Sequence, residues 1–230
     1  MKLPLALSLG LLVGASPALA QFSDGTIKIG VMNDQSGLYA DLSGQGSVWA
    51  ARKAVEDEVE VATATAVFAL RRETWSAGEA VMPAGIPHAD ALQRMPARGL
   101  PAWPQRYDMR FIEGAFPAFD EQEQDHSRSC LWVRDEPERP MDFASLAALC
   151  DSFFPRIYVR RRRRVLIGTV SLTTFFHADS HLLAQVGTSH VLGVARALNF
   201  RHGYFDQTGE IWSPEGQMLA STHQLVYFKD

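Results

Sequence analysis

The feature that most constrains the fold is one apolar helical run placed between two groups of strand-like segments. The run covers residues 143–153, with Asp142 as a predicted N-cap before it and Pro155 just past its end. The flanking segments are rich in β-branched and aromatic residues and tend to alternate apolar with polar positions, which favours strands. They are 107–113 and 129–134 before the helix, and 165–177, 189–200, 203–213 and 217–229 after it.

This order of two strands, one helix and four strands predicts an α+β domain over residues 105–230. Short turns join the last three strands, for instance Pro214-Glu215-Gly216, as expected for strands that neighbour one another in a sheet. A helix wrapped by an antiparallel sheet is the hotdog architecture. We therefore expect this fold for the C-terminal part of the chain.

Residues 59–104 precede that domain and have a different character. The stretch 59–70 alternates β-branched and small residues and predicts a strand. From residue 73 to 104, five prolines and three glycines interrupt the chain. Such a composition prevents long regular elements and predicts an irregular linker with at most a short helical turn.

The first 20 residues have the pattern of a secretory signal peptide. Lys2 supplies the positive start, an apolar stretch follows, and Ala18-Leu19-Ala20 places small residues where a signal peptidase cleaves. If the signal is used, the mature chain begins at Gln21 and is periplasmic or secreted. No other run is long and apolar enough to span a membrane.

Residues 21–58 predict one βα unit, a strand at 26–33 and a helix at 45–58. The run IKIGVMNDQSGLYADLSGQGSVWAARKAVED resembles the start of periplasmic binding proteins of the branched-chain amino acid/amide type. The resemblance ends near Asp57, and one βα unit cannot form the cleft between two lobes. A periplasmic amino acid- or amide-binding fragment of an ABC transporter is therefore the alternative function, and an inactive fusion product is another.

Residues 59–230 resemble the C-terminal portion of double-hotdog acyl-CoA thioesterases. The resemblance rests on RRETWSAGEAVMPAGIP, LAALCDSFFP, GTVSLTTFFHA and GYFDQTGEIWSPEGQMLASTHQLVYFK. It implies hydrolysis of an acyl-CoA thioester without a cofactor, in a protein ordinarily found in the cytoplasm. Only the second hotdog is whole here, and the first survives at most as 59–70. We therefore expect a homodimer formed through the hotdog sheet.

The same resemblance implies a catalytic set of Asp151, Thr169 and Gln224. Asp151 also stands out by itself, because a carboxylate near a helix C-terminus faces the negative end of the helix dipole. It lies between Cys150 and two phenylalanines, an unfavourable place for a surface charge. Thr169 and Gln224 would be ordinary strand residues without the family pattern.

A run of five arginines, Arg160, Arg161, Arg162, Arg163 and Arg164, stands just before the strand that carries Thr169. One interpretation is a solvated turn with long side chains on the surface. The other is attraction of the CoA phosphates, which guanidinium groups bind well. The formal net charge of −4 does not indicate a nucleic-acid binder.

Other constellations point to weaker hypotheses. His177 and His181 would suit a metal only on one helix, and they are interpreted as surface histidines because a strand precedes them and a loop follows. No G-x-S-x-G motif is present, which disfavours a serine hydrolase of the α/β-hydrolase type. Cys130 and Cys150 could form a disulfide in an exported protein, although free thiols are the default expectation.

Overall fold

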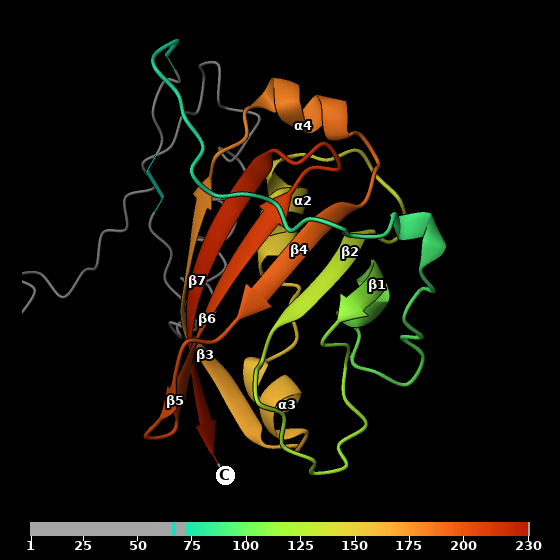
Figure 1. Ribbon diagram of the computed structural model, residues 1–230, viewed down its shortest axis with the longest axis vertical. Helices are drawn as coiled ribbons and strands as arrows, with labels where there is room; N and C mark the ends of the chain where they lie inside the picture. The colour runs from blue at the N-terminus through green and yellow to red at the C-terminus, as the bar shows by residue number, and fades with distance from the viewer. Residues whose placement is uncertain (1–65, 68–71, 230) are drawn as a thin grey trace, which may run out of the picture. The chain divides into compact units, whose positions relative to one another are not determined.

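The computed structural model describes residues 66–67 and 72–229 (Figure 1). The chain divides into two units, Met1–Leu70 and Arg71–Asp230, and every helix and strand described here lies in the second unit. The predicted signal peptide, the predicted βα unit and nearly all of the predicted strand at 59–70 fall outside the described residues. Within that strand, Ala66 and Val67 are described and have no regular secondary structure.

One antiparallel sheet forms the body of the second unit (Figure 1). Its strands follow the order β1-β2-β4-β6-β7-β3, and the short β5 pairs with β6. The strands predicted between residues 105 and 230 are confirmed with small differences at their ends. The largest difference is at β4, which is shorter than the predicted 189–200. The strands are β1 (Tyr107–Glu113), β2 (Ser129–Asp135), β3 (Leu166–Phe176), β4 (Val191–Arg196), β5 (Phe200–Arg201), β6 (Tyr204–Trp212) and β7 (Met218–Lys229).

Helix α2 (Phe143–Cys150) packs against β2, β6 and β7 on the inner face of the sheet. Asp142 is its N-cap as predicted, since the carboxylate accepts a hydrogen bond from the Ser145 backbone N–H at 2.7 Å. Leu146 and Leu149 are fully buried in the main core. The arrangement is the α+β hotdog fold that the order of elements predicts.

Helix α2 ends three residues earlier than predicted, at Cys150, and Asp151 is its C-cap. Beyond the helix end, the Phe153 ring packs onto the sheet, where two glycines leave room for it. A Cβ atom on Gly193 would lie 2.9 Å from Phe153 Cε1, and one on Gly209 would lie 3.0 Å from Phe153 Cε2.

Two short helices were not predicted. α3 (Arg156–Arg161) follows Pro155, and α4 (Ser180–Val186) begins at the N-cap Asp179, whose carboxylate accepts from Leu182 N–H at 2.8 Å. The linker contains only 3₁₀ turns, at Ala89–Ala91 and Pro104–Arg106, as its proline and glycine content predicts. No helix in the described part of the chain is long and apolar enough to cross a membrane.

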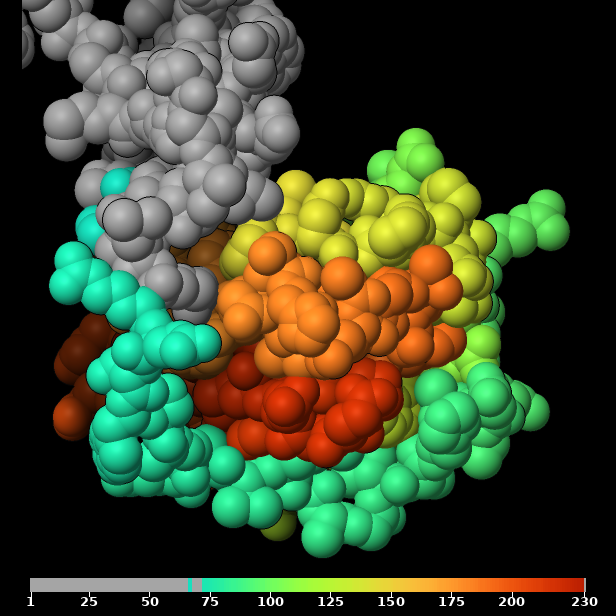
Figure 2. Space-filling model, turned by 90° about the horizontal axis from the view of Figure 1, so that it is seen from above, coloured from blue at the N-terminus to red at the C-terminus, as the bar shows by residue number. Residues whose placement is uncertain are grey.

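Residues 82–92, which we call the strap, cover the outer face of the sheet. Trp132 donates its indole N–H to the Pro87 carbonyl at 2.8 Å, and apolar strap residues pack against a second core cluster. Seen from the α4 end, the linker forms a band along one side of this unit (Figure 2). Cys130 belongs to this outer cluster and Cys150 to the inner core, and both thiols are buried and free.

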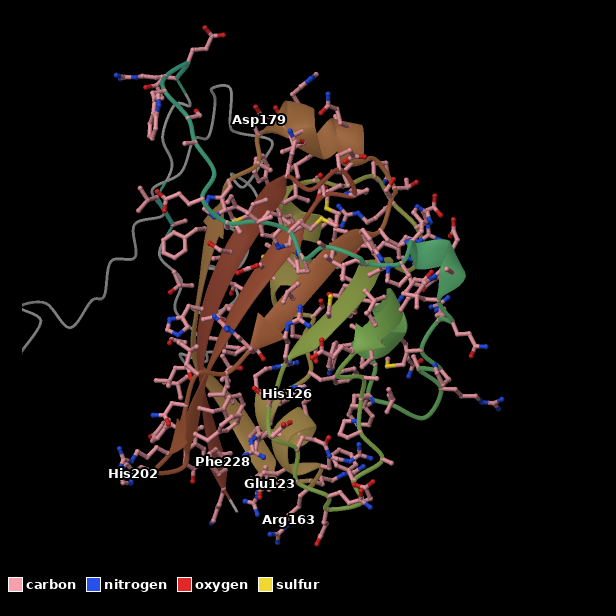
Figure 3. All side chains as sticks on the ribbon, viewed as in Figure 1. Glu123, His126, Arg163, Asp179, His202 and Phe228 are labelled. Carbon is pink, nitrogen blue, oxygen red and sulfur yellow. The ribbon has the colours of Figure 1, made fainter. Side chains whose placement is uncertain are left out.

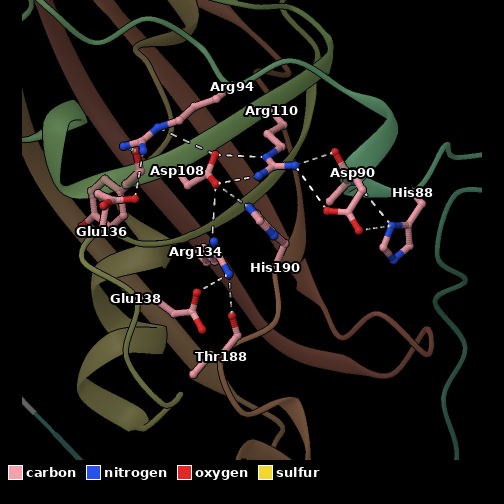
Figure 4. A network of polar contacts seen from close by, with 12 residues as sticks. His88, Asp90, Arg94, Asp108, Arg110, Arg134, Glu136, Glu138, Thr188 and His190 are labelled. Carbon is pink, nitrogen blue, oxygen red and sulfur yellow. Dashed lines mark hydrogen bonds and ion pairs between the residues drawn. The ribbon is translucent and has the colours of Figure 1, made fainter.

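A polar network lies beside the strap and centres on the buried carboxylate of Asp108 (Figure 4). Arg110 Nη2 donates to Asp108 Oδ2 at 3.0 Å, and His190 Nε2 lies 3.1 Å from the same oxygen. Arg94 and Arg134 approach to 3.9 and 3.8 Å. These contacts tie the first strand, the second strand and the residue before β4 together.

Candidate active site

A cavity of about 1130 Å³ opens between the C-terminal end of α2, strands β3 and β7, and the loops around residues 99–104 and 116–119. Its wall is mostly apolar and aromatic, with Trp103, Phe116, Phe154 and Tyr158 among the lining residues. Such a volume and lining suit a small organic ligand with an apolar portion. The polar groups on the wall are few, so their positions define the chemistry.

Asp151, Thr169 and Gln224 meet on this wall. The Gln224 side-chain amide nitrogen donates to Asp151 Oδ1 at 3.1 Å and to Thr169 Oγ1 at 2.9 Å. The three residues come from the end of α2, from β3 and from β7, and Gln224 is 73 positions from Asp151 and 55 from Thr169 in the sequence. The structure therefore brings together the three residues that the sequence singled out.

A β-bulge aims Thr169 at the cavity. The pairing of β3 with β7 shifts register between Thr169 and Ser171, so that Thr169 pairs with Val226 and Leu172 with Gln224. Without the extra residue at Val170, strict alternation from Leu172 would turn Thr169 to the opposite face. Bulges are common where a strand must redirect a side chain near a functional site.

The environment of Asp151 works in two directions on its acidity. Desolvation by the surrounding protein raises the pKa of Asp151 above its ordinary value, and the hydrogen bond from Gln224 partly opposes that rise. The carboxylate nevertheless remains accessible to solvent at the cavity wall. A carboxylate with a raised pKa and one hydrogen-bonded oxygen can accept a proton from a water molecule.

The arginine run is held mainly by an acidic loop of the same chain. Arg160 forms an ion pair with Glu123 at 2.9 Å, and Arg162 forms a two-point pair with Asp120, at 2.6 Å for each contact. The Arg164 guanidinium lies 5.3 Å from the centre of the Phe119 ring and lines the cavity.

The interpretation of the run as a turn is wrong for its first part. Arg160 and Arg161 close α3, and Arg162 is the left-handed C-cap at φ 49°. Arg163 Nε lies 4.0 Å from Glu121. Figure 3 shows Glu123 and Arg163 at the same end of this unit, far from Asp179 beside α4.

The two histidines are exposed, as expected, but α4 was missed. His177 directly follows β3, and its Nε2 lies 2.9 Å from Ser221 Oγ. His181 lies in α4 and contacts Gln185 four residues later. Among the residues that the structure describes, no group of three or more His, Cys, Asp or Glu side chains could hold a metal ion.

Two residues that contact this site through hydrogen bonds were missed in the sequence. Gln207 Nε2 donates to Gln224 Oε1 at 2.9 Å, and Arg156 Nε donates to Gln207 Oε1 at 3.0 Å. Gln207 is opposite Gln224 in the sheet register. The sequence feature that could have pointed to Gln207 is that it and Gln224 are glutamines at inward-facing positions of adjacent strands.

Comparison with solved structures places the fold in the hotdog class. A hot dog-fold protein of unknown function from Alicyclobacillus acidocaldarius is 50% identical, with a TM-score of 0.66 over 71% of this chain and 60% of that chain. A putative thioesterase II from Thermobifida fusca is 20% identical, with a TM-score of 0.53 over 70% of this chain and 59% of that one. This chain thus spans about three fifths of the length of these relatives.

Residues 83–228 match the family described as acyl-CoA thioesterase C-terminal domain. The chain belongs to this family. The match does not extend to residues 21–58, so the fusion suggested by that segment gains no support from it. A search of curated proteins found no match.

Proposed function

We propose that this protein is an acyl-CoA thioesterase-like hydrolase that uses a water molecule held by Asp151, Thr169 and Gln224. The observation that carries the proposal is the Gln224 amide, which joins the carboxylate and the hydroxyl on the wall of a large apolar cavity. Family membership supports the reaction class. The apolar part of the cavity would receive the acyl chain.

The geometry suggests how the reaction proceeds. Thr169 Oγ accepts from Gln224, which leaves its own proton free to donate into the cavity. Asp151 accepts a proton from water as the new C–O bond forms, and donors stabilise the developing oxyanion. The C–S bond then breaks, and the proton passes to the leaving thiolate, so that water and thioester give acid and thiol.

Arg164 is the member of the arginine run that best fits a role in binding the CoA phosphates, because it lines the cavity. Arg160 and Arg162 would first have to leave Glu123 and Asp120. We therefore assign any phosphate contact to Arg164 before its neighbours. An Arg164→Gln variant should raise KM for an acyl-CoA more than it lowers kcat.

The test of the reaction is the Asp151→Asn variant in an assay for free CoA thiol. Removing the carboxylate that accepts the water proton should lower kcat by about 10²-fold or more. Asp179→Asn is the matched control, because asparagine also caps a helix and Asp179 lies beside α4. Equal activity of wild type and Asp151→Asn would remove the catalytic assignment, and an inactive wild type would remove the proposed function.

We also propose that the sheet forms a homodimer through β3, with a second copy as the partner. β3 ends the strand order among the described strands and exposes apolar side chains, with Leu166 75%, Val170 56% and Phe175 58% exposed. Exposed edge strands favour pairing, and a charge on the edge opposes it. Light scattering should give a dimer for the wild type and a monomer for Val170→Lys.

A soluble wild-type monomer that unfolds cooperatively would contradict the dimer. Large soluble aggregates would instead favour an inactive product over a hydrolase.

A further inference from the structure

A chain of hydrogen bonds leads from a buried cation to the candidate active site. Arg156, the first residue of α3, has no exposed surface. Its guanidinium donates to the Phe154 carbonyl, to the Ser127 carbonyl at 2.9 Å and to Ser129 Oγ at 2.8 Å. A further bond runs to Gln207, so the main donors of this cation are used inside the protein.

The charge of Arg156 is not balanced by an ion pair with any carboxylate in the described part of the chain. Burial lowers the pKa of Arg156 to about 9, which still leaves the guanidinium charged at neutral pH. A buried charge is costly unless hydrogen bonds satisfy it. The hydrogen bonds to Phe154, Ser127, Ser129 and Gln207 offset that cost and hold the charge in a fixed place beside the site.

In this series of hydrogen bonds, from Arg156 through Gln207 to Gln224, the direction of each bond follows from the one before it. A guanidinium can only donate, so Gln207 must turn its oxygen toward Arg156 and its NH₂ group toward Gln224. Gln224 must then present its oxygen to Gln207. Its NH₂ group is left facing Asp151 and Thr169.

We propose that Arg156 and Gln207 are positioning residues that fix the orientation of the Gln224 amide and thereby hold Asp151 as a carboxylate. The proposal rests on the proposed function, in which Gln224 joins the carboxylate to the hydroxyl. Hydrogen bonds in series polarise one another, so a cation at one end strengthens the donor at the other. Gln207 and Gln224 are only 1% and 6% exposed, and this burial shields their hydrogen bonds from competing water.

The other ionisable groups near Asp151 do not carry a charge that could replace the effect of Arg156 on this carboxylate. Burial raises the pKa of the adjacent Cys150 to about 12, and burial together with Asp135 and Asp151 raises the pKa of Tyr107 on β1. Both groups are therefore neutral at pH 7. Among the described residues that line the cavity, the remaining cation is Arg164, whose guanidinium lies over the Phe119 ring.

Gln207→Glu is the decisive variant because it keeps the size of the side chain and reverses one hydrogen bond. The new carboxylate stays ionised beside Arg156 and can only accept hydrogen bonds. Gln224 must therefore turn its NH₂ group toward this carboxylate and its oxygen toward Asp151. The pKa of Asp151 should then rise by about one unit or more. The new ion pair should preserve the folded state.

Two measurements separate this proposal from the proposed function. The carboxyl carbon of Asp151 is titrated by NMR, with Asp151→Asn identifying its signal, and this readout needs no turnover. In the thioester assay, Gln207→Glu should lower kcat by about 10²-fold with little change in KM, and the acid limb of the pH profile should move to higher pH. Gln185→Glu, the same change on exposed α4, is the control and should alter neither quantity.

An unchanged Asp151 pKa in Gln207→Glu would overturn the relay, whether or not the protein hydrolyses thioesters. A wild type that releases no CoA would remove the proposed function, while the titration would still test the relay. If Gln207→Glu does not fold, Gln207→Met serves instead. Loss of the Gln207 bond leaves the Gln224 amide free to turn, so a smaller rise of the Asp151 pKa supports the proposal and no rise contradicts it.

Discussion

Replacing Gly209 by alanine tests whether the sheet was shaped to receive Phe153. A Cβ atom at Gly209 would lie 2.6 Å from Thr222 Cγ2 and 3.0 Å from Phe153 Cε2. Thr222 is the paired residue on β7, so neither strand can move away without loss of sheet hydrogen bonds. One of the two side chains must therefore leave its position.

Overpacking of this kind costs about 1–3 kcal/mol. For a domain of this size, each kcal/mol lowers Tm by about 2–4 °C, so we expect a loss of roughly 2 to 12 °C. Activity should fall as well, since Phe153 is two residues from Asp151 and a displacement of about 1 Å at a catalytic group can cost about 10²-fold.

Gly168→Ala is the matched control for thermal unfolding followed by circular dichroism. Gly168 is also a strand glycine, but no atom lies within 4 Å of its added Cβ. Alanine there should leave Tm unchanged or stabilise the protein by up to about 1 kcal/mol, because it restricts the unfolded chain. Equal melting temperatures for the two variants would refute the argument that Phe153 requires the glycine.

Three further predictions follow from the fold and the sequence. Asp142→Ala should lower the free energy of unfolding by about 1 kcal/mol in urea denaturation, while Asp142→Asn should retain the cap; equal losses would contradict a capping role. Burial, together with Arg134 and Arg110, holds the pKa of His190 below its ordinary value, although Asp108 opposes this shift. As the pH falls, the unfolded chain therefore binds a proton at this histidine before the folded chain does. The free energy of unfolding should then fall as pH drops below about 6.5. His190→Gln should flatten that decline between pH 7.5 and 5.5, and an unchanged slope would assign it to other groups. Protein recovered from cells should lack Met1–Ala20 by intact mass, and a full-length mass would mean that the signal is not used.

The sequence predicts the sheet better than the short helices. The strands alternate over many residues, and that period survives because one face of each central strand is buried. α3 and α4 have only six and seven residues, too few for a helical period to emerge, and α3 contains a run of arginines that suggested a turn. Their helicity depends on tertiary contacts, such as the burial of Ile157 and Val159.

The candidate site was predicted from the family resemblance, not from local pattern. Asp151 alone had an independent signal, its place at a helix end among apolar residues. The bulge at Val170 that turns Thr169 inward leaves no mark in a single sequence. Arg156 was missed because its burial depends on groups from distant segments, including Ser127 and Gln207.

Thr169 lies on β3, the outermost described strand on its side of the sheet, next to the extra residue that aims it. Whatever pairs with this edge will also set how rigidly the hydroxyl is held. For the proposed hydrolase and the proposed dimer through β3, turnover per chain should therefore rise with protein concentration, as the edge becomes occupied. A substitution that changes the solubility of this edge should therefore also change the rate of the proposed reaction, since one strand carries both the edge and Thr169.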